Sequence, residues 1–287
     1  MILLTGADGF LGSKLKKVLN LNSNNAYLLS SKKKDGYLKC DLASLSETQS
    51  IAEQINPKII IHCAALVPRN QSEYEESLIN NKSFLINQNV EKCFKTKMIF
   101  ISSMTVYKNH IVSEKSYSEN LTDISLLNGY AKVKLESEYL FNNSKNIDVI
   151  NLRLPGLFSE ERRNGLIYNL VKAFINNENF EPNKTLPFWS TMHLNDAARV
   201  IKYFVDNFSK ISHKTINVGY PGKSSIPLMI KMISSLFDKS FDIEKYETPE
   251  FEMDLKLLNK YLKFHEGILE ERILNFVNHH KKINYER

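Results

Sequence analysis

The sequence predicts an α/β fold in which a doubly wound parallel sheet is joined to a smaller C-terminal lobe. Three observations support this fold class. An apolar strand that begins at Met1 runs directly into a glycine-spaced turn and an amphipathic helix. Strands and helices then alternate as far as Leu154, and beyond this residue the pattern loosens. Alternation of this kind is typical of parallel strands joined by right-handed crossovers.

The turn after the first strand has the spacing Gly-x-x-Gly-x-x-Gly, formed by Gly6, Gly9 and Gly12. Gly6 allows a sharp turn, Gly9 allows the backbone to approach a pyrophosphate, and Gly12 allows the helix to pack closely on the strand. The N–H groups at the start of that helix would face the anion. The pattern therefore predicts a Rossmann-type dinucleotide site, and the alternative is a tight turn with no ligand.

The remaining elements follow from apolar runs and from helical spacing. Further strands are expected at 26–30, 37–40, 58–63, 98–102 and 148–152, with helices at 46–54, 73–93 and 129–141. The continuous apolar run within 58–63 is typical of a strand that is buried on both faces. In the second half, helices are expected at 165–176, 195–208, 226–237 and 255–262, and a strand at 215–218.

Composition limits the class of protein. The chain has 287 residues, of which 43% are hydrophobic, enough to bury a sizeable core. Its formal charge of +6 is spread along helices, which argues against a nucleic-acid surface. The sequence has no apolar run of membrane-spanning length and no leader ahead of the first strand, so we expect a cytoplasmic protein without a membrane partner. Cys40, Cys63 and Cys93 lack metal-ligand spacing, so free thiols and no metal are expected.

A second pattern, Tyr130-x-x-x-Lys134, stands at the start of an expected helix. Residues four apart share one helix face, so both side chains can point into one site. A nearby ammonium favours the phenolate and lowers the pKa of a tyrosine, which suits it to acid–base catalysis. The strand expected at 98–102 leads into Ser103, whose hydroxyl could orient the substrate oxygen that Tyr130 protonates or deprotonates.

Together these motifs resemble the extended short-chain dehydrogenase/reductases, a family of nucleotide-sugar epimerases, dehydratases and ketoreductases. The resemblance covers nearly the whole chain and implies that Ser103, Tyr130 and Lys134 are catalytic. It implies a dinucleotide-binding domain at 1–154, with segments of about 191–219 returning to it, and a substrate-binding lobe at 155–190 and 220–287. It also implies a homodimer formed through the helices at 73–93 and 129–141.

The resemblance also implies which residues of this chain contact the ligands, because their positions match those of the family's ligand-binding residues. The cofactor contacts so implied are Gly6, Asp8, Gly9, Phe10, Leu11, Gly12, Ser30, Ser31, Lys32, Asp41, Leu42, Cys63, Ala64, Ala65, Asn80, Ser102 and Pro155. The substrate contacts so implied are Met104, Thr105, Arg162, Arg163, Asn164 and Trp189. For Asp41 the alternative is a cap for the next helix. His62 is interpreted as a packed residue, and His193 and Asp196 as structural.

The choice of nicotinamide cofactor depends on the end of the second strand. Enzymes that prefer NAD usually have an acidic side chain there, which binds the ribose 2′-hydroxyl, whereas a basic side chain accommodates the 2′-phosphate of NADP. This strand ends in Ser30-Ser31-Lys32-Lys33-Lys34, with no carboxylate before Asp35. The pattern favours NADP(H). The alternative is a solvated lysine run and an enzyme that uses NAD(H).

The positions at which this sequence differs from the family pattern limit the reactions that are expected of it. Met104 and Thr105 stand where the family's sugar 4,6-dehydratases have an Asp-Glu pair, so dehydration by that route is not expected. Trp189 stands where many nucleotide-diphosphate-sugar enzymes have an arginine. We predict a ketoreductase in which NADPH reduces a keto group of a nucleotide-diphosphate sugar. The alternatives are a nucleotide-sugar epimerase with tightly bound NAD and a non-catalytic NADP-binding sensor.

Overall fold

The computed structural model describes residues 1–66, 77–108, 116–178, 189–240, 242 and 251–285. The chain divides into two compact units. Unit 1 contains Met1–His110, Glu119–Leu154 and Ala198–Ile216, and unit 2 contains Ile111–Ser118, Pro155–Ala197 and Asn217–Arg287. Of the segment expected to return to the first domain, about 191–219, Ala198–Ile216 lies in unit 1 and the residues on either side lie in unit 2.

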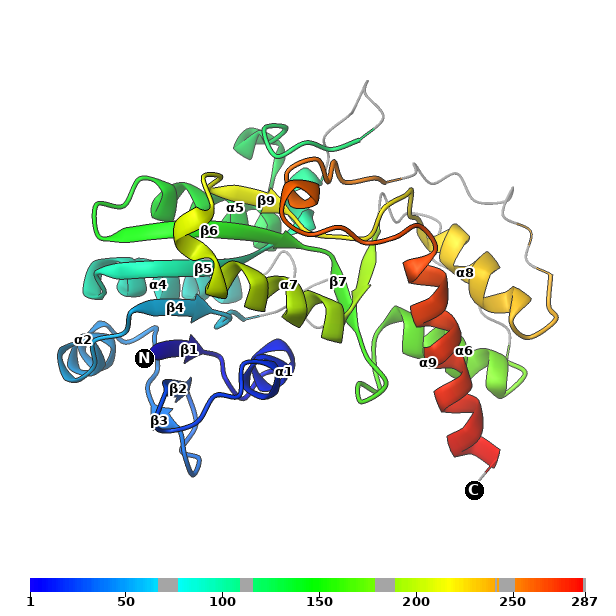
Figure 1. The fold of residues 1–287 in the computed structure, drawn as a ribbon, viewed down its shortest axis with the longest axis horizontal. Helices are drawn as coiled ribbons and strands as arrows, with labels where there is room; N and C mark the ends of the chain where they lie inside the picture. The colour runs from blue at the N-terminus through cyan, green and yellow to red at the C-terminus, as the bar shows by residue number, and fades with distance from the viewer. Residues whose placement is uncertain (67–76, 109–115, 179–188, 241, 243–250, 286–287) are drawn as a thin grey trace. The chain divides into compact units, whose positions relative to one another are not determined.

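Unit 1 is built on the seven-stranded sheet, in the order β3-β2-β1-β4-β5-β6-β9 (Figure 1). Its strands are β1 (Ile2–Thr5), β2 (Ala26–Ser30), β3 (Leu38–Lys39), β4 (Ile59–His62), β5 (Thr96–Ser103), β6 (Ile147–Leu154) and β9 (Thr215–Asn217). The pairs β1–β2, β1–β4, β2–β3, β4–β5 and β5–β6 are all parallel. The strand order reverses between β1 and β4, so ligands are expected beyond the carboxyl ends of these strands. The doubly wound fold is confirmed.

Four helices of unit 1 are α1 (Phe10–Val18), α2 (Leu45–Gln54), α4 (Ser77–Cys93) and α5 (Gly129–Asn142). One apolar core joins the sheet to α2, α4 and α5 through buried residues that include Leu3, Ile60, Val90, Phe100 and Phe141. Two short 3₁₀ helices, η1 (Met104–Tyr107) and η2 (Ile124–Leu126), follow β5 and precede α5. The helix α7 (Leu194–Asp206) begins in unit 2 and ends in unit 1, where η3 (Phe208–Lys210) follows it.

A buried polar chain runs through this core. The hydroxyl of Thr5 lies 2.8 Å from Nδ1 of His62, and Nε2 of His62 lies 2.8 Å from Oδ1 of Asn87. Asn87 then donates to the hydroxyl of Ser137. The amide oxygen of Asn87 can only accept, so Nε2 of His62 carries the proton and Nδ1 accepts one from Thr5. Burial lowers the pKa of His62 to about 4, so the ring is neutral at physiological pH. His62 is packed, as predicted.

Unit 2 packs three helices together, α6 (Leu166–Ile175), α8 (Ile226–Ser235) and α9 (Ile268–Tyr285) (Figure 1). Their shared core includes Leu170, Ile230, Ile273 and Phe276. A two-stranded parallel sheet, β7 (Gly156–Phe158) and β8 (Thr191–His193), and the 3₁₀ helix η5 (Leu258–Lys260) complete the regular structure described for this unit. Among the helices of the described residues, none is long and apolar enough to span a membrane.

The predicted elements of the first half agree with the structure to within a few residues, although residues 73–76 of one predicted helix lie outside the described part of the chain. The second half agrees less well. The sequence reading missed β7, β8 and α9, and where it predicted a helix at 255–262 the structure has only the short η5. Sequence periodicity is weak evidence for strands as short as β7 and β8.

Candidate active site

The glycine turn between β1 and α1 is pressed against the end of β4. Gly6 has a φ of +62°, and a Cβ atom built on it would lie 3.0 Å from backbone atoms of Cys63 and Ala64. A Cβ atom on Gly12 would lie 2.1 Å from the carbonyl oxygen of Gly6. Side chains are therefore excluded from a backbone cradle at the edge where the strand order reverses. A cradle of this form fits the pyrophosphate of a dinucleotide.

Most other residues predicted to contact the cofactor lie round this cradle or at neighbouring strand ends. Phe10 and Leu11 are half-buried in the first turn of α1, and the N–H of Ala64 donates to the hydroxyl of Thr5. Ala65 is half-buried just beyond β4, and Asn80 is buried in α4. These positions are compatible with the predicted role. Pro155 belongs to unit 2, where it is buried.

At the end of β2, a carboxylate approaches the sheet from the glycine turn. The hydroxyl of Ser30 donates to Oδ2 of Asp8 at 2.9 Å, and the N–H of Lys32 donates to the same hydroxyl oxygen at 3.1 Å. Ser30 is buried, whereas Asp8, Ser31 and Lys32 are exposed. The sequence reading placed Asp8 and Ser30 in the cofactor site separately and did not foresee that they bind each other.

Asp41, predicted to lie near the adenine, is held by local contacts. Its Oδ1 accepts a hydrogen bond from the N–H of Ala43 at 3.0 Å, and its Oδ2 lies 3.3 Å from Nζ of Lys82. The side chain that caps α2 is that of Ser44, which accepts from the N–H of Glu47. Asp41 therefore stabilises the turn before α2, and the alternative that it is the cap itself is wrong. Leu42 beside it is buried.

The carboxyl end of β5 carries Ser102 and Ser103. The Oγ of Ser103 accepts hydrogen bonds from the N–H and the hydroxyl of Thr105, at 3.2 and 3.0 Å. Because Ser103 is the acceptor in both, its own proton can be donated to a substrate oxygen. Ser103 is half-buried, as is Thr105, and Met104 between them is buried.

Lys134 lies on α5 beside this strand end. Its Nζ donates to the carbonyl oxygen of Ile101 at 2.7 Å and lies 5.7 Å from the centre of the Tyr130 ring. The side chain is buried, and burial lowers the pKa of Lys134 to about 8, although Cys63 and Glu138 oppose that shift. The structure thus places Tyr130 and Lys134 on one helix face. The ammonium of Lys134 contacts Ile101 of β5, which precedes Ser103 by two residues.

Behind these residues lies a buried ion pair that the sequence reading missed. Glu138 accepts hydrogen bonds from Nε and Nη2 of Arg153 on β6 and from the hydroxyl of Ser102. Arg153 also donates to the hydroxyl of Tyr107 at 2.8 Å. The two charged side chains are 1% and 3% exposed. The available signal was the spacing: Glu138 follows Lys134 by four residues, so it shares the helix face of Tyr130 and Lys134.

The residues predicted to bind the substrate's diphosphate belong to unit 2. Nε of Arg162 donates to Oδ1 of Asn164 at 2.5 Å, and Nη1 of Arg162 donates to the carbonyl oxygen of Leu157. Arg163 and Asn164 are exposed, and Trp189 is half-buried. The guanidinium of Arg163 is therefore accessible for an anion, while that of Arg162 is oriented by its neighbours.

Unit 2 also contains a polar network that involves His193 and Asp196. Nε2 of His193 lies 3.0 Å from a carboxylate oxygen of Glu160, and Asp196 accepts from the hydroxyl of Tyr220 and from Nε of Arg272, each at 2.6 Å. The hydrogen bond from His193 lowers the pKa of Glu160 to about 2. These contacts are structural, and the role of Arg272 was not foreseen.

The fold and this site define the chain as a member of a nicotinamide-dependent enzyme family. Residues 2–219 match the model of the NAD dependent epimerase/dehydratase family, and the chain belongs to this family. The predicted family is confirmed. No curated protein sequence matches the chain.

Solved structures share the fold over nearly the whole chain. The UDP-glucose 4-epimerase of Thermotoga maritima, solved with UDP-glucose, is 16% identical, with 99% of both chains covered and a TM-score of 0.74. MoeE5, in complex with UDP-glucuronic acid and NAD, is 20% identical, with 98% of this chain and 99% of that chain covered and a TM-score of 0.72. The UDP-N-acetylglucosamine 4-epimerase of Bacillus cereus is 18% identical, with 96% and 97% covered and a TM-score of 0.68.

Proposed function

We propose that this protein catalyses hydride transfer between a nicotinamide dinucleotide and a hydroxyl-bearing or keto carbon of a nucleotide-activated sugar. The observation that carries the proposal is the placement of Lys134. Its buried ammonium is fixed by the carbonyl oxygen of Ile101 and lies 5.7 Å from the ring centre of Tyr130. A buried ammonium held in this way next to a phenol favours the phenolate and so supports proton transfer.

The chain's own residues supply the acid–base chemistry. Tyr130 gives its phenolic proton to the substrate oxygen, or takes one from it, as hydride arrives at or leaves the attached carbon. Lys134 stabilises the phenolate, and Ser103 donates a hydrogen bond to the same substrate oxygen. Gly6, Gly9 and Gly12 would hold the pyrophosphate of a nicotinamide dinucleotide, which would supply or accept the hydride.

A nucleotide-diphosphate sugar is the proposed substrate class. Arginine binds phosphate well because its guanidinium presents paired donors. Arg163 is exposed beside Arg162 and Asn164 in unit 2. Trp189 is the predicted contact for the base, and the alternative is that it fills the core of the lobe, against which it packs. The similar proteins solved with UDP-glucose and with UDP-glucuronic acid support the same class of substrate.

Two net reactions can use this chemistry, namely epimerisation and reduction. The preference for reduction by NADPH rested on the absence of a carboxylate after β2. Because Asp8 brings a carboxylate to Ser30, that reason is lost. We therefore take epimerisation with retained NAD as the first candidate, and the fold shared with two 4-epimerases supports it. Ketoreduction is the second candidate, supported by the exposed Lys32 and Lys33.

Product analysis tests the proposal. The purified protein is incubated with a panel of UDP- and dTDP-sugars and their 4-keto derivatives, with NAD, NADH or NADPH, and the products are identified by nuclear magnetic resonance. An epimer formed without net consumption of cofactor supports the first candidate, and a new alcohol formed with oxidation of NADH or NADPH supports the second. Tyr130→Phe should lower either activity by about 10²–10⁴-fold.

Tyr203→Phe is the matched control, because Tyr203 is a half-buried tyrosine on α7 with no assigned part in the site. It should leave turnover unchanged. Turnover that survives in Tyr130→Phe would contradict the proposed mechanism. A protein that binds the dinucleotide but converts none of the sugars would support the third alternative, a sensor.

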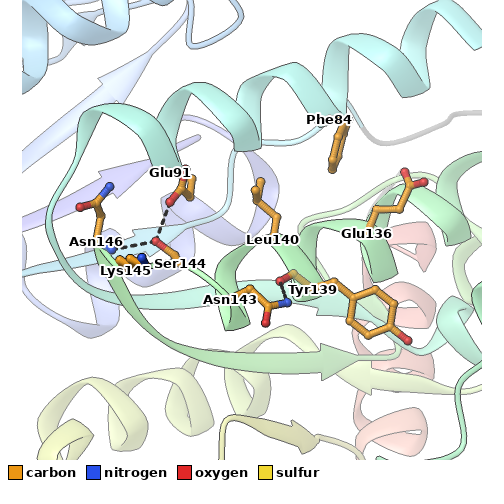
Figure 2. A pocket seen from close by; sticks show the side chains of 9 residues that line it. All are labelled: Phe84, Glu91, Glu136, Tyr139, Leu140, Asn143, Ser144, Lys145 and Asn146. Atoms are coloured by element: carbon orange, nitrogen blue, oxygen red, sulfur yellow. Dashed lines mark hydrogen bonds between the residues drawn. The ribbon is translucent and has the colours of Figure 1, made fainter.

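A homodimer through α4 and α5 is proposed as well. Figure 2 shows side chains of both helices around a pocket, among them Phe84, Tyr139 and Leu140. The volume of this pocket is about 680 Å³. Nearby on α4, Leu78 and Leu85 are 73% and 42% exposed. Exposed apolar groups gathered on two helices are typical of an interaction surface. Sedimentation equilibrium should show a dimer that Leu85→Asp disrupts, and Leu274→Asp on α9 is a control of similar exposure.

A further inference from the structure

The carboxylate of Asp8 has an unusual origin. It comes from the glycine turn, 22 residues before the strand end that it reaches, and Oδ2 accepts the proton of the Ser30 hydroxyl at 2.9 Å. That hydroxyl oxygen also accepts from the N–H of Lys32 at 3.1 Å. Ser30 is 3% exposed, so this contact is a fixed feature at the end of β2. Asp8 itself is exposed, so the carboxylate also faces ligands in solution.

The position matters because the end of β2 is where doubly wound dinucleotide folds recognise the adenosine ribose. A carboxylate there accepts a hydrogen bond from the 2′-hydroxyl of NAD and repels the 2′-phosphate of NADP. In this chain the residues that follow β2 are Ser31, Lys32 and Lys33, which supply no carboxylate. Asp8 supplies one from the neighbouring turn.

Several lysines follow β2 in the sequence, but not all of them are available to attract the 2′-phosphate of NADP. Nζ of Lys34 lies 5.0 Å from the centre of the Tyr37 ring, and Nζ of Lys16 lies at the same distance from it. Lys34 is therefore engaged with an aromatic ring. Lys32 is tied to Ser30 through its backbone N–H, and Lys32 and Lys33 are both exposed to solvent. A fixed carboxylate acts on a bound ribose more strongly than a solvated ammonium.

We propose that Asp8 is the residue that selects the cofactor, and that it makes this site prefer an adenosine ribose with a free 2′-hydroxyl, NAD(H), over one with a 2′-phosphate, NADP(H). The inference rests on the proposed function only in that a nicotinamide dinucleotide binds at the glycine cradle. It requires no turnover and no knowledge of the sugar.

Direct binding tests the proposal. The full chain is freed of any co-purified nucleotide with charcoal and titrated calorimetrically with NADH and NADPH. The wild type should bind NADH about tenfold or more tightly than NADPH, as expected for a like charge placed beside a phosphate. Asp8→Asn should bring the ratio of the two dissociation constants close to one, mainly through tighter binding of NADPH. A wild type that prefers NADPH, or a ratio unchanged in Asp8→Asn, would overturn the proposal.

Asp35→Asn is the matched control, because Asp35 is the first carboxylate that follows β2 in the sequence and is exposed. It removes the same charge nearby and should leave the ratio unchanged; a ratio that collapses here instead would assign selection to Asp35. Asp8→Ala serves as a second variant if the asparagine variant does not fold.

The failure of this inference and the failure of the proposed function are distinguishable. Binding of neither dinucleotide overturns both. Selective binding that depends on Asp8, without conversion of any sugar, overturns the proposed reaction and leaves the role of Asp8 standing. Titration with AMP and with adenosine 2′,5′-bisphosphate isolates the adenosine end, and the same tenfold preference for AMP should disappear in Asp8→Asn.

Discussion

One buried charge in each unit shows two opposite ways of holding such a charge. In unit 1 the ammonium of Lys134 is buried against a carbonyl oxygen and a tyrosine ring, and burial lowers its pKa to about 8. In unit 2 the carboxylate of Asp196 is paired directly with Arg272. Burial alone would raise the pKa of Asp196, but hydrogen bonds from Arg272 and Tyr220 hold it below its usual value.

This difference indicates which region carries chemistry. A charged group whose burial disfavours its charged form lowers the stability of the fold. Proteins retain such groups chiefly where the reaction needs them. A charge that is paired at close range stabilises the fold. On this criterion Lys134 marks the chemical part of the molecule, whereas the network round Asp196 and the pair Glu138–Arg153 stabilise the fold.

The largest change in stability is expected when the buried ion pair between Glu138 and Arg153 is broken. Arg153→Met leaves Glu138 buried without its counter-ion and should lower the free energy of unfolding by about 3–5 kcal/mol, measured by urea denaturation. The double variant Glu138→Gln with Arg153→Met should lose much less than that. A single variant as stable as the wild type would show that this pair does not hold unit 1 together.

The next largest change in stability is expected when His62 becomes protonated at low pH. Its pKa is about 4 in the folded protein and 6.5 when unperturbed, so the folded state binds fewer protons between these values. The stability that the neutral ring contributes is complete above pH 6.5 and is lost as the pH falls through 6.5 towards 4, by about 3 kcal/mol.

Denaturation measured from pH 7 to pH 4 should therefore show a slope that is reduced in His62→Gln. His280, whose pKa burial also lowers, contributes in the same direction, so His280→Gln is the comparison. Equal slopes in wild type and His62→Gln would contradict the assignment. Glu160, whose pKa is about 2 in the folded protein and 4.5 when unperturbed, also adds to the slope near pH 4.5 and below, so the slopes are compared between pH 7 and pH 5.

Lys134→Met should stabilise the protein, whereas Arg153→Met destabilises it. The Lys134 substitution removes a charge that burial disfavours and should raise the free energy of unfolding by about 2 kcal/mol at pH 7, while it abolishes turnover. Because the folded pKa is about 8 and the ordinary value 10.5, wild-type stability should rise between these values and the gain in the variant should shrink. A variant destabilised at pH 7 would show that Lys134 serves the fold.

The smallest effect is expected in unit 2. The side chain of Arg272 is 27% exposed, although that of Asp196 is 1% exposed, and the hydroxyl of Tyr220 also donates to this carboxylate. Arg272→Met should therefore lower the free energy of unfolding by about 1–2 kcal/mol, less than Arg153→Met, because water and Tyr220 still satisfy part of Asp196. Turnover should change little. A loss as large as that in Arg153→Met would remove the distinction between the two kinds of ion pair.

Most of unit 1 could be predicted from the sequence because its signals are local. The alternation of strands and helices, the glycine turn and the spacing of Tyr130 and Lys134 each lie within a short stretch of chain, and the structure reproduces all three. Unit 2 was harder to predict, since β7 and β8 have three residues each and α9 was missed altogether. The assignment of Ser103, Tyr130 and Lys134 as catalytic stays a prediction.

By itself, the sequence determined the fold class, the family and the set of side chains at the strand ends, because periodicity and i, i+4 spacing act over a few residues. Only the tertiary structure decided which partner each buried or fixed charged side chain meets. Asp8 reaches Ser30 across 22 residues, Arg153 reaches Glu138 across 15, and Arg272 reaches Asp196 across 76. Such pairs depend on which strands and helices become neighbours in space, and the order of residues along the chain does not specify that directly.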